Sequence, residues 1–157
     1  MVMERTSRRL RLCCTALVLI LAFIWGNSLL PGELSAAFSQ WVKDLLSRIF
    51  PGVDPGSEGH GLLRKLAHFS EFACLGACLG WLWGMLANNT AHVLLSAFGC
   101  GFTAACVDET IQRFVPGRSS SFTDVMIDSS GVILGIALLA LGFYLCKHKF
   151  TLKRKGK

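Results

Sequence analysis

Charged residues are scarce in this chain of 157 residues. Asp, Glu, Lys and Arg together make up 17% of the sequence, whereas hydrophobic residues make up 52%. The hydrophobic residues gather in long runs, which a soluble domain of this size would have to expose to water. The composition therefore excludes an ordinary soluble fold and predicts an integral membrane protein with a single domain, residues 1–157.

Cysteine is absent from the polar connections between the apolar runs. The seven cysteines all lie inside those runs, at Cys13, Cys14, Cys74, Cys78, Cys100, Cys106 and Cys146. A disulfide framework would place cysteines in exposed loops, and no C-x-x-C pair is present to suggest a redox or metal motif. We interpret these residues as small packing side chains.

Four apolar runs approach the length of about 20 residues that a helix needs to cross a bilayer. They cover approximately residues 10–30, 62–86, 92–114 and 123–146. Glycines recur four residues apart in the second run (Gly76, Gly80, Gly84) and in the fourth (Gly131, Gly135). This spacing favours close approach between helix backbones. We predict an all-α fold, a polytopic membrane four-helix bundle.

Basic residues predict the orientation of the bundle. Ten of the sixteen Lys and Arg residues lie within residues 1–11 and 147–157. Positive charge is retained in the cytoplasm, so we expect a multi-pass protein of the cell membrane with both termini cytoplasmic. The loops at residues 31–61 and 115–122 would then lie outside. We expect no nucleic-acid partner for so short a basic tail.

One further helix is predicted between the first two spans, at about residues 34–50. Its apolar residues recur at steps of three and four, at Leu34, Phe38, Trp41, Leu45 and Ile49. This helix is too polar to span the membrane, and the pattern is typical of an amphipathic helix. Two positions remain open: an extracytoplasmic interfacial helix, or a lid packed on the bundle. Residues 51–61 are interpreted as a flexible linker.

Ionisable residues occupy the outer end of three of the four spans. With alternating helix directions, the start of the second span, the end of the third and the start of the fourth all lie on the same side. The residues there, with two loop arginines, are the predicted ligand-binding set: Arg64, Lys65, His68, Glu71, Asp108, Glu109, Gln112, Arg113, Arg118, Asp124 and Asp128. Intramembrane ionisable residues of this kind indicate a functional site, with a structural polar network as the alternative.

The charges in this set do not balance. Five carboxylates face three reliably charged bases, Lys65, Arg113 and Arg118, with Arg64 at the rim. A bound divalent cation or a protonated carboxyl would absorb the difference. No metal-ligand spacing or nucleophile motif identifies a cofactor. If the site is catalytic, the candidates are His68, Glu71, Asp108, Glu109 and Asp124.

Three motifs carry a family resemblance. Residues 64–72 read RKLAHFSEF, residues 108–118 read DETIQRFVPGR, and residues 124–131 read DVMIDSSG. Together they resemble the VanZ-like family of teicoplanin-resistance proteins, whose pattern is R-K-x-A-H-F-x-E-Y, then D-E-x-x-Q-x-F-x-P-G-R, then D-x-x-x-N-x-x-G. Two positions depart from it. Phe72 replaces the usual Tyr, and Asp128 replaces the usual Asn and adds a negative charge.

The resemblance implies a membrane protein linked to glycopeptide resistance or to the cell envelope. Its charged outer-leaflet pocket would bind an anionic ligand, a lipid-linked cell-wall precursor or a lipophilic glycopeptide. Two other functions remain open. One is an intramembrane metal-dependent hydrolase or phosphoryl transferase acting on a polyprenyl phosphate. The other is a structural accessory subunit whose charges only lock the bundle.

Overall fold

The computed structural model describes residues 2–49 and 59–155, and it confirms the all-α fold. These residues form five helices and no strand. The helices are α1 (Val2–Ser28), α2 (Gly32–Ile49), α3 (Gly59–Leu86), α4 (Thr90–Arg113) and α5 (Phe122–Lys155). The predicted linker at residues 51–61 falls mostly outside the described residues, and α3 already begins at Gly59.

The four predicted spans correspond to α1, α3, α4 and α5. The parts of these helices that are long and apolar enough to cross a membrane are Thr6–Ser28, Leu62–Leu86, Thr90–Arg113 and Phe122–His148. The last helix runs further than predicted, because the lysine-rich tail continues it to Lys155. Lys has a high helix propensity, and cations near a helix C-terminus interact favourably with the helix dipole.

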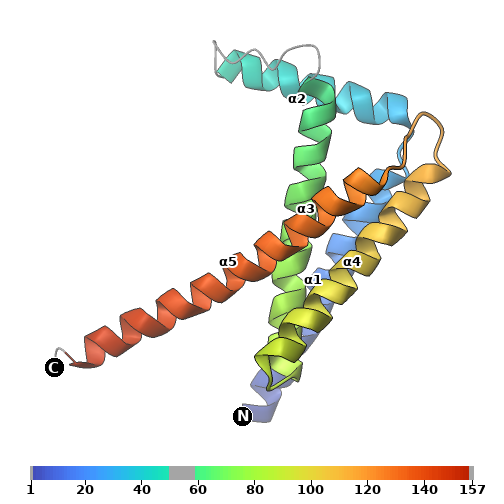
Figure 1. Cartoon of the computed structure of the whole chain (residues 1–157). Coiled ribbons are helices and arrows are strands. Elements are labelled where there is room, and N and C mark those ends of the chain that lie inside the picture. The colour runs from blue at the N-terminus through green and yellow to red at the C-terminus, as the bar shows by residue number, and fades with distance from the viewer. Residues whose placement is uncertain (1, 50–58, 156–157) are drawn as a thin grey trace.

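The helix α3 is the centre of the bundle. It packs against α1, α2, α4 and α5, and its most extensive contact is with α5. Figure 1 shows α2 lying across one end of α3, while both chain termini lie towards the other end.

Two Pro-Gly turns meet near α2, where the Gly32 amide donates to the Pro116 carbonyl at 3.0 Å. Gly117 adopts the left-handed conformation with φ +73, which favours glycine.

Glycines determine how closely α3 and α5 approach. A Cβ atom added to Gly76 would collide with the Val132 carbonyl oxygen, and one added to Gly135 would collide with the Ala73 carbonyl oxygen. Gly131 lies equally close to the Phe69 carbonyl oxygen of α3. The backbones of the two helices are therefore in direct contact, as the glycine spacing predicted. In contrast, no atom lies within 4 Å of the Cβ position of Gly84.

The apolar face of α2 is not packed on the bundle. Phe38 and Trp41 are 66% and 60% exposed, and Leu34, Leu45 and Ile49 are exposed as well. Among the described side chains of this helix, the buried ones are Ser35 and Ser39. The helix thus contacts the bundle through its small polar residues and leaves its apolar face free. The exposed apolar face agrees with an interfacial helix, and the opposite face packs on α3, as a lid would, so both positions stay predictions.

A Gly135→Ala substitution tests the contact between α3 and α5. We expect it to lower the free energy of unfolding by about 1–3 kcal/mol, because the added methyl group would force the backbones apart. Gly84→Ala is the matched control, and it should be neutral or stabilising, since alanine is favoured over glycine in a helix. Thermal unfolding of the purified variants in detergent measures both, and equal stability of the two would contradict the packing.

Candidate functional site

The helix directions bring the predicted ionisable residues to one end of the bundle, the end covered by α2. The first turns of α3, the last turns of α4 and the first turns of α5 meet there. We call the residues they contribute the polar cluster: Arg64, Lys65, His68, Glu71, Asp108, Glu109, Gln112, Asp124 and Asp128. Five members, His68, Asp108, Glu109, Gln112 and Asp128, are buried. Buried ionisable groups of this kind require compensating partners.

Asp108 lies at the centre of the polar cluster and is 0% exposed. The Gln112 amide, one turn along α4, donates to Asp108 Oδ2 at 2.7 Å and to the Ser28 hydroxyl of α1 at 3.3 Å. His68 Nδ1 of α3 lies 3.7 Å from the same carboxylate oxygen. The Gln112 amide therefore connects Asp108 to α1, and His68 of α3 lies beside the same carboxylate.

Ser121 organises the start of α5. Its hydroxyl donates to Asp124 Oδ2 at 3.0 Å, and its backbone amide donates to Glu109 Oε2 of α4 at 2.9 Å. Lys65 Nζ lies 3.6 Å from Asp124 Oδ1. Because the Lys65 side chain is 43% exposed, this ion pair contributes little stability.

Arg118 binds backbone carbonyls at the end of α1, although the sequence suggested pairing with carboxylates. Its Nη2 donates to the Asn27 oxygen at 2.7 Å, and its Nε donates to the Leu30 oxygen at 3.1 Å. A cation is favoured beside the unpaired carbonyls of a helix C-terminus. Burial lowers the pKa of Arg118, and the positive charge of Arg64 lowers it further, while Asp108, Glu109 and Glu71 oppose the shift.

Some members of the site differ from the sequence prediction. Arg113 is the last residue of α4 and is exposed, so the structure does not bring its side chain into the cluster. Conversely, α1 supplies Asn27, which donates to Glu71 Oε1 at 3.3 Å, and the buried Ser28. In the sequence, the contribution of α1 is indicated only by this pair of polar residues, which stands shortly before Pro31-Gly32. The signal for Ser121 was the S-x-x-D capping pattern before the fourth span.

A very small pocket lies inside the polar cluster. Its volume is about 10 Å³, which is room for a water molecule or an ion but not for an organic ligand. The residues that line it are Arg64, Lys65, His68, Glu109, Gln112, Asp124, Ile127 and Asp128.

A second cavity, which we call the α2 cavity, adjoins the first and has a volume of about 300 Å³. Its apolar lining is Phe23, Leu30, Phe38, Val42, Leu63 and Ala67. Its polar lining is Asn27, Ser35, Ser39, Arg64, His68 and Glu71. Arg64 and His68 line both spaces. The α2 cavity therefore combines an apolar wall from three helices with one edge of the polar cluster.

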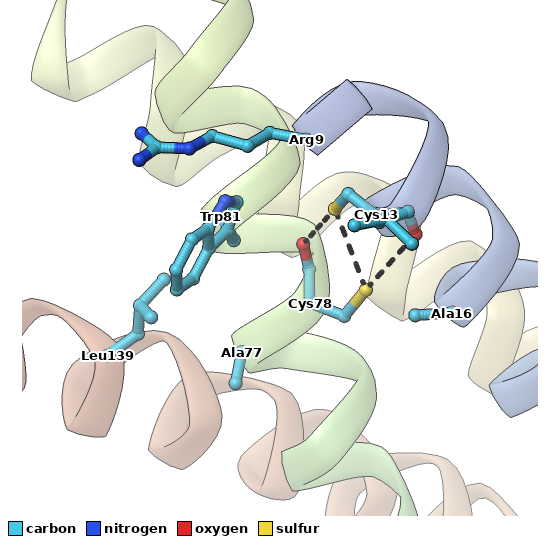
Figure 2. A pocket seen from close by; sticks show the side chains of 8 residues that line it. Arg9, Cys13, Ala16, Ala77, Cys78, Trp81 and Leu139 are labelled. Carbon is cyan, nitrogen blue, oxygen red and sulfur yellow. Dashed lines mark hydrogen bonds between the residues drawn. The ribbon is translucent and has the colours of Figure 1, made fainter. Parts of the chain in front are cut away.

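A third cavity, of about 390 Å³, lies towards the chain termini and is shown in Figure 2. Its lining is mainly apolar, with Arg9 at one side and Trp81 below it. The Cys13 and Cys78 sulfur atoms lie 3.9 Å apart there, and each thiol donates to the carbonyl of the other residue. All seven cysteines are free, and four of them, Cys14, Cys74, Cys100 and Cys146, are exposed. Without a carboxylate or histidine, this cavity is not the candidate site.

A Gln112→Leu substitution tests whether the amide holds the cluster together. It would leave the buried Asp108 and Ser28 without their amide donor, so we expect the free energy of unfolding to fall by about 1–3 kcal/mol. Gln40→Leu is the matched control, because the exposed Gln40 also donates to an aspartate one turn away, Asp44. It should change stability by less than about 0.5 kcal/mol. The free energy of unfolding of each purified variant in detergent is compared with that of the wild type. If both variants are as stable as the wild type, the Gln112 amide does not stabilise the cluster.

Three comparisons with known proteins bear on the family of this chain. A search of curated proteins and of solved structures finds no match in either. A family model described as VanZ/LLP1 matches residues 13–144, which is well over half of the chain and includes the whole polar cluster. The chain is therefore a membrane protein that belongs to the VanZ/LLP1 family, as its three motifs predicted.

Proposed function

We propose that this protein binds a lipid with an anionic head group from the outer leaflet of the cell membrane. A lipid-linked cell-wall precursor and a lipophilic glycopeptide both have this character. The proposal rests above all on the α2 cavity, whose lining is apolar on one side and on the other includes the buried His68 and the half-buried Arg64 and Glu71. Binding sites for amphipathic ligands combine apolar walls with a few placed polar groups.

Arg64 is the residue best placed to hold an anionic head group. It lines both the α2 cavity and the small pocket of the polar cluster. It also lies close enough to Arg118 for its charge to lower the pKa of that guanidinium. Guanidinium groups pair well with phosphate or carboxylate oxygens, so Arg64 is suited to hold an anion at the edge of either space.

The position of α2 supports entry from the membrane. Its exposed apolar residues include Phe38, which also lines the α2 cavity. A lipid chain lying in the bilayer next to this helix would therefore meet apolar surface all the way into the cavity. An interfacial helix of this type lies at the boundary between head groups and acyl chains.

The orientation of the chain supports an extracytoplasmic site. The helix α2 and the helix ends that carry the polar cluster lie at the end of the bundle opposite the termini (Figure 1). If the basic termini are retained in the cytoplasm, this end faces outward. Glycopeptides act on lipid-linked precursors outside the cell, so a site on that side would have access to both. A role in reduced glycopeptide susceptibility follows from this position and from the family resemblance.

An Arg64→Gln substitution tests the head-group site. We expect purified wild-type protein to bind a polyprenyl phosphate more tightly than the uncharged polyprenol. The variant should lose about tenfold in affinity for the phosphate, because a charge-assisted hydrogen bond contributes about 1.5–3 kcal/mol. Arg48→Gln, which removes an exposed arginine of α2, should bind as wild type. Native mass spectrometry of the detergent-solubilised protein measures these affinities.

Two results would overturn the proposal. One is equal binding of the polyprenyl phosphate and the polyprenol, and the other is an equal loss in the Arg64→Gln and Arg48→Gln variants.

In cells that express the protein, Arg64→Gln should remove any decrease in teicoplanin susceptibility while the amount of protein in the membrane is unchanged. Arg118 is less suitable for this test, since its contacts with α1 carbonyls make it structural.

A further inference from the structure

We propose that His68, Asp108 and Asp128 form a binding site for one divalent transition-metal ion. The three residues come from α3, α4 and α5, respectively. Each offers a ligand atom, an imidazole nitrogen or a carboxylate oxygen, and these atoms all lie within 4.8 Å of one another. Ligand atoms around an ion at about 2.1 Å lie roughly 3–4 Å apart, so a small side-chain movement closes the set.

Burial and missing hydrogen bonds support an ion at this place. His68, Asp108 and Asp128 are 7%, 0% and 2% exposed. Among the described residues, neither ring nitrogen of His68 has a hydrogen-bond partner, and Asp108 Oδ1 has none either. Buried polar atoms without partners destabilise a protein, and metal coordination would satisfy the imidazole and the carboxylate together.

The charged groups around this site carry a net charge of −2 when all of them are ionised. Five carboxylates face this end of the bundle, from Glu71, Asp108, Glu109, Asp124 and Asp128, and three cations face them, Arg64, Lys65 and Arg118. Lys65 pairs with Asp124, and Arg118 donates to carbonyls of α1. Within the described part of the chain, no lysine or arginine forms an ion pair with Asp108 or Asp128. In the described residues Glu71 and Glu109 lack such a pair as well, and one divalent ion at Asp108 and Asp128 would balance the excess of two negative charges.

The supporting contacts fit a metal site as well. Gln112 fixes Asp108 through its amide, and hydrogen bonds of this kind orient metal ligands. The small pocket of about 10 Å³ borders both His68 and Asp128, so a water molecule has room to complete the coordination shell. A set of one imidazole and two carboxylates suits Mn²⁺, Fe²⁺ or Zn²⁺.

The metal site goes beyond the proposed lipid site, and it can exist whether or not a lipid binds. The two sites are linked through His68, which lines the α2 cavity. An ion held there would turn an acidic cluster into an attractive centre for an anionic head group. The ligands tested below are nevertheless different residues from Arg64, so the failure of one proposal is distinguishable from the failure of the other.

Binding of Mn²⁺ to the purified full-length protein tests the site. Mn²⁺ is the suitable probe because the seven cysteines would compete for Zn²⁺ but bind Mn²⁺ poorly. The protein is first treated with a chelator and then titrated with Mn²⁺. Binding removes the electron paramagnetic resonance signal of free Mn²⁺, and we expect this loss to correspond to one ion per chain. Asp128→Asn should weaken binding at least about tenfold. Glu33→Gln, which removes an exposed acid of α2, should leave binding unchanged.

A second measurement covers the case in which Asp128→Asn does not fold. Pulsed electron paramagnetic resonance of Mn²⁺ bound to the wild-type protein should show coupling to an imidazole nitrogen, which a surface carboxylate site would not give. The proposal is overturned if no Mn²⁺ binds, if bound Mn²⁺ shows no nitrogen coupling, or if a folded Asp128→Asn variant binds it as wild type does.

Discussion

The burial of carboxylates inside a bundle of apolar helices is the constraint on which this structure depends. Asp108 is completely buried, and its charge or its proton must be accommodated by groups from other helices. Gln112, Ser28 and His68 lie around it and draw α1, α3 and α4 together. The glycine contact between α3 and α5 completes this arrangement. Gly131 meets the Phe69 carbonyl, directly beside His68, and so brings α5 with Asp128 against α3.

Much of this architecture could be predicted from the sequence. Hydropathy alone gave the four spans, and their alternating direction placed the ionisable residues of α3, α4 and α5 at one end. The glycine spacing identified the contact between α3 and α5, but not that Gly84 lies outside it. The spacing of glycines shows which of them share one face of a helix. It does not show how far along that face the partner helix remains in contact.

The contribution of α1 was the main element that the sequence did not reveal. Asn27 and Ser28 stand at the end of an apolar run, where polar residues usually only terminate a helix. Their role depends on which helix packs beside them, and contacts across 44 and 84 residues of sequence cannot be derived from local patterns. Arg113 shows the opposite case. Its charge suggested a place in the cluster, but it ends α4 and remains exposed.

The geometry also bears on the three functions that the sequence left open. Gln112 of the polar cluster and the loop residue Arg118 stabilise the bundle, since both donate hydrogen bonds to groups at the end of α1. A purely structural network would nevertheless satisfy its polar atoms. In the described residues His68 and Asp108 retain unpartnered atoms, and His68 lines the α2 cavity, which favours a ligand site. A hydrolase would need both a bound metal ion and a bound substrate. Catalysis therefore depends on metal binding and lipid binding, which can each be measured first.

The central claim is that the buried residues of α3 and α4 act as one coupled unit. A double-mutant cycle with His68→Gln, Asp108→Asn and the combined variant tests it most directly, with the free energy of unfolding in detergent as the readout. The account predicts a coupling free energy above about 0.5 kcal/mol between these side chains. Effects that add to within about 0.3 kcal/mol would contradict it, because they would mean that His68 and Asp108 do not interact.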